Sequence, residues 1–539
     1  MNHESKTGTA LQRRDLLAAC GWGTAALLLN SPGSSFAQPA PPSSTALRIA
    51  LSSLRGEVMD PVQGHPDKSL KLPMYDVLVG VNAEGTALST QTGLATRWDQ
   101  SADGLSWTFK LREGVPFHRG AGMVTAEDVA FSVGRMLGPD ATTGAVPYFR
   151  ATLDRIETPD KSTVVMHLKR RSIDLPVMLS LLRQSEGMVL PKAHFERVGR
   201  DEFFRNPVGS GPYEFVSRTP GSKVVLRALP THWSYGTPRY QTLEFLQVPE
   251  DSTRVTMLRK GEVNVIDVPR RLYASLKKDG KLNVSARVGD STYVIWMAGQ
   301  RPERPTGPFA NDKVRAALST AIDRTQIVKL FGGGDLARVA TRVGGCGSWN
   351  DACPSSTPDL YDPGLARKLL AESGLAPFDI EIHLTQIYPE QKDVSEVLAG
   401  YWSAIGLRPK IVPMDFATWR QGFAAGRQPV NSLVAHENPN SVISNSTLSA
   451  FYSKASPIQV TSRDDIQALL DRASTAPTAE GQGAALGGVG RLIFDSRIEL
   501  PLVESGMVIA FDRSVVNRTL GGRQYADYGL REMLTGGRG

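Results

Sequence analysis

The chain of 539 residues is longer than one hydrophobic core usually supports, which predicts two or three lobes. Its 41% hydrophobic and 21% charged content is ordinary for a globular protein, and no apolar run beyond the N-terminal region reaches the roughly 18 residues that a membrane-spanning helix needs. The formal net charge of +7 comes from interspersed charges without a basic block, which argues against nucleic-acid binding.

The first 37 residues have the three parts of an export signal. Arg13 and Arg14 form a basic region, residues 16–29 form an apolar core, and Ser35-Phe36-Ala37 is a small-x-small cleavage site. The arginine pair resembles a twin-arginine signal, and an ordinary secretory signal is the alternative. We therefore expect residues 1–37 to be an export signal peptide, residues 38–45 to be a linker, and the mature protein to work in the periplasm.

Strand and helix patterns alternate from residue 46 onwards. Apolar residues recur at every second position in residues 47–51 and 105–112, which predicts strands. Thr125 to Asp128 has the sequence of a capping box and predicts the start of a helix. Further helices are expected from Asn311 through Val328, from Asp362-Pro363 to Gly374, and around residues 466–473. This mixture predicts an α/β fold.

Two of the three cysteines remain after removal of the signal. Cys346 and Cys353 are separated by a polar, glycine-containing loop, and an oxidising compartment favours a disulfide between them. A metal-binding pair and two free thiols are the alternatives. The eight histidines are scattered singly, and the sequence lacks a Gly-x-Ser-x-Gly elbow, a His-Glu-x-x-His motif and a phosphate-binding loop. We therefore expect no enzyme activity, no cofactor and no metal.

A series of short segments carries a family pattern in order along the chain. The segments are Met59-Asp60-Pro61, Tyr75 to Leu78, Leu94 to Trp98, Asp103 to His118, Thr125 to Phe131, Pro207 to Tyr213, Lys260 to Asn264, Val314 to Leu318, Ala321 to Arg324 and Ala366 to Gly374. Together they resemble the bacterial extracellular solute-binding proteins of family 5, the dipeptide/oligopeptide/nickel type of periplasmic binding protein that serves ABC transporters. Most of them are explained equally well as turns and core strands, with Gly209 to Pro212 as a tight chain reversal rather than a phosphate site.

The resemblance implies a periplasmic binding protein-like α/β fold of class II (cluster C), with two lobes that close on a cleft and an extra inserted domain. Domain I is expected at residues 46–75, 205–290 and 497–539, the inserted domain II at 76–204, and domain III at 291–496. The implied function is capture of a small solute, most directly a peptide or peptide-like amine, for delivery to the permease subunits of an ABC importer. The protein is expected to be a monomer. An opine, a sugar derivative, a metal chelate, and an exported hydrolase are the alternatives.

The same resemblance suggests three isolated ligand contacts. His65 follows the Asp-Pro pair, where peptide binders offer an extended segment to the peptide main chain. Tyr148 follows Pro147 and offers an apolar face with a polar tip. Trp419 matches a tryptophan of the third domain, although an aromatic residue on an amphipathic helix also suits a core. A surface loop is the alternative for His65.

The most informative segment is Ser432 to Asn440, which occupies the place of the family's cleft strand. Ala435, His436, Glu437 and Asn438 are the candidate ligand contacts there. Peptide binders present an aspartate for the ligand's α-ammonium group, and this chain departs from the pattern by offering Glu437 instead. A buried ammonium group needs such an acceptor, because an unpaired buried charge is costly. We therefore predict that Glu437 is the cationic anchor.

Overall fold

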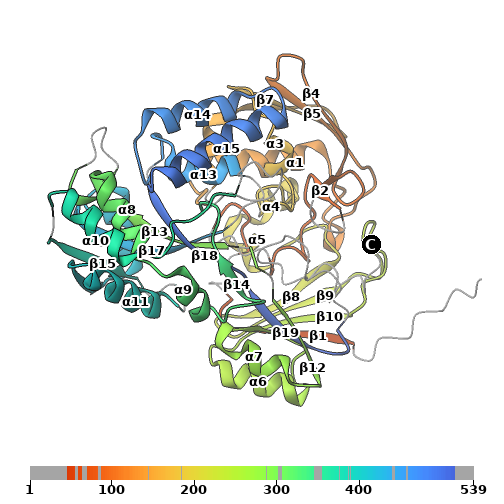
Figure 1. Ribbon diagram of the computed structural model, residues 1–539. Coiled ribbons are helices and arrows are strands. Elements are labelled where there is room, and N and C mark those ends of the chain that lie inside the picture. The colour runs from red at the N-terminus through yellow and green to blue at the C-terminus, as the bar shows by residue number, and fades with distance from the viewer. Residues whose placement is uncertain are drawn as a thin grey trace, which may run out of the picture. The chain divides into compact units, whose positions relative to one another are not determined.

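The computed structural model describes fifteen stretches of the chain, all of them within one compact unit, Pro42–Gly539. They are residues 45–54, 59–63, 69–82, 87–143, 145–183, 185–286, 288–289, 291–300, 306–344, 355–375, 377–385, 388, 390–439, 444–456 and 459–515. His65, Cys346, Cys353 and the expected signal peptide lie outside the described residues. Three larger sheets organise this unit, and helices cover them (Figure 1).

The first sheet has seven strands in the order β12-β19-β11-β1-β10-β9-β8. Its strands come from distant parts of the chain, because β1 pairs in parallel with both β10 and β11, and β19 near the C-terminus pairs with β11 and β12. The bounds are β1 Ala46–Leu51, β8 Tyr213–Thr219, β9 Lys223–Ala228, β10 Thr242–Gln247, β11 Val265–Val268, β12 Leu282–Ala286 and β19 Val508–Asp512. Its helical elements are α6 Asp251–Lys260, η4 Arg270–Leu272 and α7 Tyr273–Lys277.

The second sheet has four antiparallel strands in the order β4-β5-β7-β6. The strands are β4 Ala95–Gln100, β5 Ser106–Leu111, β6 Leu153–Asp160 and β7 Thr163–Leu168, and β2 Gly80–Val81 pairs with β3 Leu88–Ser89 nearby in sequence. The helices of this part are η2 His118–Gly120, α1 Ala126–Gly134, η3 Arg135–Leu137, α2 Val146–Thr152, α3 Leu175–Met178, α4 Lys192–Val198 and α5 Arg200–Arg205.

The third sheet has six strands in the order β14-β18-β13-β17-β15-β16. The strands are β13 Ser291–Met297, β14 Ala337–Val339, β15 Asp379–Leu384, β16 Arg408–Pro413, β17 Ser432–Pro439 and β18 Glu499–Ser505. One face packs on a core that includes side chains of η5 Pro308–Ala310, α8 Asp312–Thr320, α9 Arg324–Leu330, α10 Pro363–Glu372 and α11 Gln391–Ala404. The other face packs on α12 Phe416–Ala424, α13 Ser444–Tyr452, α14 Asp464–Thr475 and α15 Ala479–Asp495.

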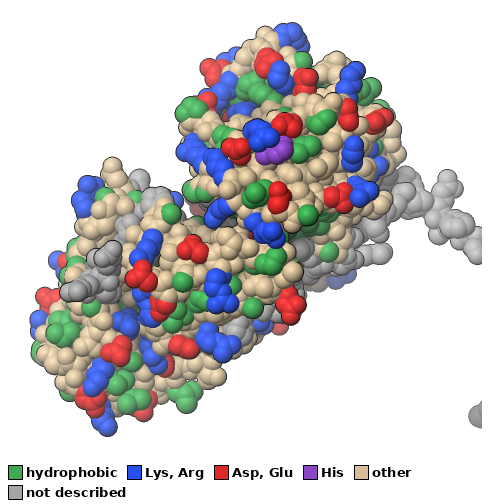
Figure 2. Space-filling model, turned by 90° about the horizontal axis from the view of Figure 1, so that it is seen from above, with side chains coloured by type: hydrophobic (Ala, Val, Ile, Leu, Met, Phe, Trp, Pro, Cys, Tyr) green, Lys and Arg blue, Asp and Glu red, His purple; other side chains and the backbone are tan. Residues whose placement is uncertain are grey.

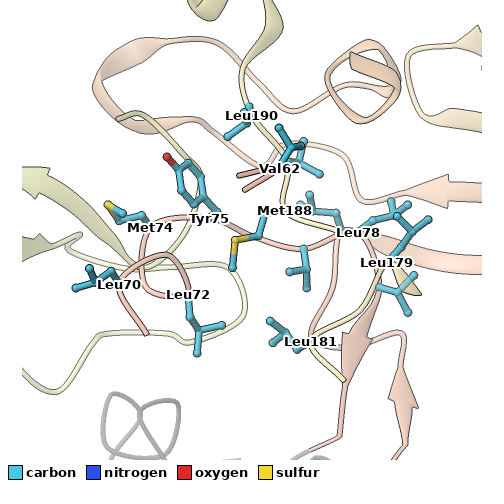
Figure 3. Close-up of a cluster of buried hydrophobic side chains, with 14 of the residues drawn as sticks. Val62, Leu70, Leu72, Met74, Tyr75, Leu78, Leu179, Leu181, Met188 and Leu190 are labelled. Atoms are coloured by element: carbon cyan, nitrogen blue, oxygen red, sulfur yellow. The ribbon is translucent and has the colours of Figure 1, made fainter. Parts of the chain in front are cut away.

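One hydrophobic core joins the seven-stranded and four-stranded sheets. Ile49 and Phe245 of the first sheet belong to the same buried cluster as Phe109 and Met166 of the second. Figure 3 shows part of this cluster, in which side chains from residues 62–78 meet side chains from residues 179–190. The six-stranded sheet has separate cores on its two faces. The molecule therefore consists of a two-sheet part and a one-sheet part.

Within the described elements, the chain passes between these two parts at two places. Ala286 ends β12 in the seven-stranded sheet, and Ser291 begins β13 in the six-stranded sheet. The return crossing runs from Ser505 at the end of β18 to Val508 at the start of β19. β18 thus pairs in the six-stranded sheet, although it lies in the segment predicted for domain I. The exact domain division stays a prediction.

Several predicted helix boundaries agree with the structure, and one differs. The capping box of Thr125 and Asp128 starts α1, and Asp362 caps α10 by accepting from the Leu365 N–H group at 2.8 Å. The helix expected from Asn311 through Val328 is two helices, α8 and α9. The reason is Asp323, whose side chain accepts hydrogen bonds from the N–H groups of Thr325 and Gln326 and so begins a new helix.

Charged side chains of both signs are interspersed over the face shown in Figure 2. No helix in the described part of the chain is long and apolar enough to cross a membrane.

Candidate functional site

β17 carries four of the predicted ligand contacts and places them alternately on two faces of the six-stranded sheet. Successive side chains of a strand point to opposite faces. His436 stacks on Trp296 of β13, whereas Glu437 accepts a hydrogen bond from Arg270 of η4, in the two-sheet part. The predicted group of contacts is therefore divided, with Ala435 and Glu437 on one face and His436 and Asn438 on the other.

Ala435, His436 and Trp419 take part in packing. Ala435 is fully buried, and its carbonyl oxygen accepts a hydrogen bond from Gln391 at 2.8 Å. The His436 ring lies 4.2 Å from the Trp296 ring, and Trp419 is 2% exposed in the same stack. Burial lowers the pKa of His436 to about 3, with a smaller contribution from Arg420. His436 is therefore neutral at physiological pH, and Trp419 lies in the core.

Glu437 is the centre of a largely buried polar group at the two chain crossings. Its carboxylate accepts from Arg270 at 3.1 Å and also from Ser291 and Ser505, which mark the ends of the crossings. Arg270 pairs at the same time with Glu390 at 2.8 Å. Although burial lowers the pKa of Arg270, its attraction to Glu437 and Glu390 outweighs that effect and raises it overall. The side chains of Arg270, Glu390 and Glu437 are 11% to 12% exposed.

The side chain of Asn438 differs from that of Glu437, since no described residue forms a hydrogen bond with it. It is fully buried, and neither its amide nitrogen nor its amide oxygen has a hydrogen-bond partner among the residues that the structure describes. It packs closely on Gly344, where an added Cβ atom would lie 2.2 Å from the Asn438 Nδ2 atom. An unsatisfied buried polar group costs roughly 1 to 3 kcal/mol. The Asn438 carboxamide thus offers a donor and an acceptor with which no described residue pairs.

Glu499 supports the same face of the sheet from β18. Its carboxylate accepts hydrogen bonds from the Trp296 Nε1 atom at 2.9 Å, from the Tyr452 hydroxyl and from the Gly344 N–H group. Trp296 in turn stacks on His436, and Gly344 contacts Asn438. Burial raises the pKa of Glu499 to about 7. The Glu499 carboxyl group therefore holds both Trp296, on which His436 stacks, and Gly344, on which Asn438 packs.

Tyr148 lies in the four-stranded part, next to a contact with the one-sheet part. Its hydroxyl shares a hydrogen bond of 2.8 Å with Ser172, and burial, followed by the nearby Asp174 charge, raises its pKa. Asp174 accepts hydrogen bonds from Asn445 of α13 at 2.8 Å and from Gln482 of α15 at 3.0 Å. α13 also supplies Tyr452, so this contact adjoins the face that carries Asn438.

Sequence patterns did not identify Arg270, Glu390, Asp174 or Glu499. Arg270 lies 167 positions from Glu437, and Asp174 lies 271 positions from Asn445, so no local spacing could connect them. Within the described ranges, no group of three or more His, Cys, Asp or Glu side chains could hold a metal ion.

Comparison with known proteins identifies the family that this architecture represents. Residues 89–448 match the family model described as bacterial extracellular solute-binding proteins, family 5 middle. Heme-binding protein A of Haemophilus influenzae is 27% identical over 383 residues, which is 67% of this chain and 68% of that protein. The dipeptide-binding protein of Escherichia coli is 26% identical over 375 residues, or 65% of this chain and 67% of that protein. The glutathione-binding protein of Salmonella typhi is 28% identical over 346 residues, which is 63% of this chain and 64% of that protein.

Solved structures share the fold. A binding protein from A. tumefaciens R10 in complex with mannopinic acid is 25% identical, has a TM-score of 0.70, and is matched over 87% of this chain and 95% of its own. The peptide-bound DppA of Helicobacter pylori is 22% identical with a TM-score of 0.73, over 90% and 97% of the two chains. The predicted periplasmic binding protein-like fold is confirmed.

Proposed function

The chain belongs to the bacterial extracellular solute-binding proteins of family 5, and from this membership we propose that it captures a small solute in the periplasm for the permease subunits of an ABC importer. The predicted export signal at residues 1–37 supports the periplasmic location. The relatives named above are binding proteins, which fits a protein without catalytic turnover. The disulfide between Cys346 and Cys353 stays a prediction that suits the same compartment.

We propose that the solute is a peptide or a peptide-like amine. Relatives that bind dipeptides and glutathione support this class, and the mannopinic acid complex supports an opine as the second candidate. The observation that carries the proposal is the buried side chain of Asn438, which has no hydrogen-bond partner in the described part of the chain. A carboxamide offers both a donor and an acceptor, which is what the amide or terminal groups of a short peptide need.

We place the principal anchor at Asn438 and not at Glu437. The Glu437 carboxylate already has Arg270, Ser291 and Ser505 as partners, whereas Asn438 has none among the described residues. A ligand group that pairs with Asn438 removes the cost of its burial, so binding gains from a partner that the described residues do not supply. Tyr148 lies in the facing part of the molecule and remains a candidate contact, as do His65 and His436.

Titration of a panel of dipeptides to pentapeptides tests this function. A bound peptide is expected to raise the melting temperature, since a solute that binds only the folded state stabilises it by mass action, and the peptide is recovered intact. Asn438→Ala is expected to weaken binding at least tenfold, whereas Asn283→Ala, at an exposed position of β12, leaves it unchanged. If only mannopinic acid or a related opine raised the melting temperature, the solute class would be wrong, and hydrolysis of a peptide would contradict the binding-protein function.

A further inference from the structure

Asp174 joins the two parts of the molecule far along the chain from the crossings. The four-stranded part, which carries Asp174, shares a core with the seven-stranded sheet, whereas Asn445 and Gln482 belong to the part built on the six-stranded sheet. Among the described elements, the covalent connections between these sheets run from Ala286 to Ser291 and from Ser505 to Val508. Two parts joined by a pair of short crossings can rotate about them as a hinge.

The contact itself is a buried carboxylate held by two neutral amides. Asp174 is 7% exposed, and its Oδ2 atom accepts from the Asn445 Nδ2 atom at 2.8 Å and from the Gln482 Nε2 atom at 3.0 Å. Asn445 and Gln482 are themselves 6% and 7% exposed. No cation lies within ion-pair distance of Asp174 in the described part of the chain, although Arg170 is close enough to act on it electrostatically. Separation of the two parts would return all three side chains to water.

We propose that Asp174 is the closure residue of this binding protein, and that its carboxyl group takes up a proton when the two parts close on each other. The carboxyl group is then a positioning group, because it acts by holding α13 and α15 against the four-stranded part. The proposal goes beyond the binding function, since it concerns the open and closed forms of the protein without a ligand.

The electrostatic surroundings of Asp174 support this coupling. Burial raises the pKa of Asp174, and the hydrogen bonds from Asn445 and Gln482 and the charge of Arg170 offset only part of that increase. The other titratable group that faces it is Tyr148 of α2, which stays neutral because burial raises its pKa too. In an open form the exposed carboxyl group would have its ordinary pKa near 4. The closed form therefore holds the proton more tightly, and closure is favoured at low pH and weakened as pH rises through the raised pKa.

The distance between the two parts can be measured directly in the protein without ligand. Spin labels on unnatural amino acids at the exposed positions 113 and 480 report from the four-stranded part and from α15, and pulsed EPR gives the distance distribution. We expect the population at the short distance of this structure to be at least twofold larger at pH 5 than at pH 8. Asp174→Asn is expected to abolish this difference, because an amide keeps the size but cannot titrate. Asp154→Asn, a control at an exposed position of β6, is expected to keep it.

A second variant, which keeps Asp174 and changes only one of its partners, tests whether the pH response comes from this carboxyl group. Asn445→Ala removes one hydrogen bond that stabilises the carboxylate, so the pH response is expected to persist and move to higher pH. A distance distribution that is the same at pH 5 and pH 8 in the unmodified sequence would overturn the proposal, as would an undiminished pH response in Asp174→Asn. Because no solute is added, these outcomes are independent of whether the peptide assignment is correct.

Discussion

Glu499 is the buried acid whose titration should be visible in the stability of the whole protein. It is fully buried, and burial raises its pKa from 4.5 to about 7. A raised pKa means that the folded state prefers the protonated form, so this group stabilises the fold below pH 4.5 and loses that contribution as pH rises to about 7. A shift of this size corresponds to roughly 3 kcal/mol. Glu499→Gln should therefore show a smaller loss of unfolding free energy between pH 5 and pH 8 than the unmodified chain.

Urea denaturation at several pH values measures this difference. All other titrating groups are common to both proteins, so subtracting one pH profile from the other isolates Glu499. Glu113→Gln, at an exposed position, is the matched control and should leave the profile unchanged. Parallel pH profiles for Glu499→Gln and the unmodified chain would show that the carboxyl group ionises without cost in the folded protein.

For single residues, the sequence predicted the position of the strand that carries the candidate ligand contacts, but not the contacts that its side chains make. Ser432 to Asn440 was singled out, and β17 spans Ser432–Pro439. The chemistry assigned to Glu437 depended on its neighbours in space, and Arg270 and Glu390 reach it from distant segments. That Asn438 is buried without a hydrogen-bond partner among the described residues is a property of packing, so sequence alone could not distinguish it from a solvated asparagine.

Individual elements were more predictable, because local rules determine where they begin and turn. The capping box at Thr125, the cap at Asp362 and the alternation in residues 105–112 all correspond to elements of the structure. The predicted chain reversal at Gly209 to Pro212 has a tertiary component that the sequence could not reveal. There the chain packs directly on the backbone of residues 73–75.

Gly209→Ala should therefore be strongly destabilising although its backbone conformation is ordinary. An added Cβ atom would lie 2.1 Å from the Met74 carbonyl oxygen, and backbone cannot move aside as a flexible side chain can. We expect a loss of about 3 kcal/mol or more in unfolding free energy. Gly134→Ala is the control, because that glycine is helical with open space around it, and alanine should stabilise the helix by up to about 1 kcal/mol. Equal urea midpoints for the two variants would contradict the close approach.

For the whole molecule, the order of the family-like segments predicted an architecture that composition alone could not. Composition and periodicity led only to α/β lobes, whereas the resemblance implied two closing parts with an inserted domain. The structure has a two-sheet part and a one-sheet part connected by two crossings. The polar group at these crossings could not be anticipated, since Arg270, Glu390 and Glu437 come from three separate segments.

Arg270 and Glu437 of this polar group should contribute unequally to the stability of the molecule. Arg270→Met leaves two largely buried carboxylates without their cation and is expected to lower the unfolding free energy by about 3 kcal/mol. Glu437→Gln removes one carboxylate but leaves Arg270 paired with Glu390, so we expect a smaller loss of about 1 to 3 kcal/mol.

Urea denaturation at pH 7 without ligand distinguishes these outcomes. Arg155→Met breaks exposed ion pairs in the four-stranded part and should cost less than about 1 kcal/mol, which sets the baseline for losing one arginine. In the double variant Arg270→Met/Glu437→Gln, only Glu390 remains unpaired, so the total loss should be smaller than the sum of the two single losses. Strict additivity, or a cost for Arg270→Met no greater than for Arg155→Met, would mean that solvent already satisfies these charges and that the crossings do not depend on them.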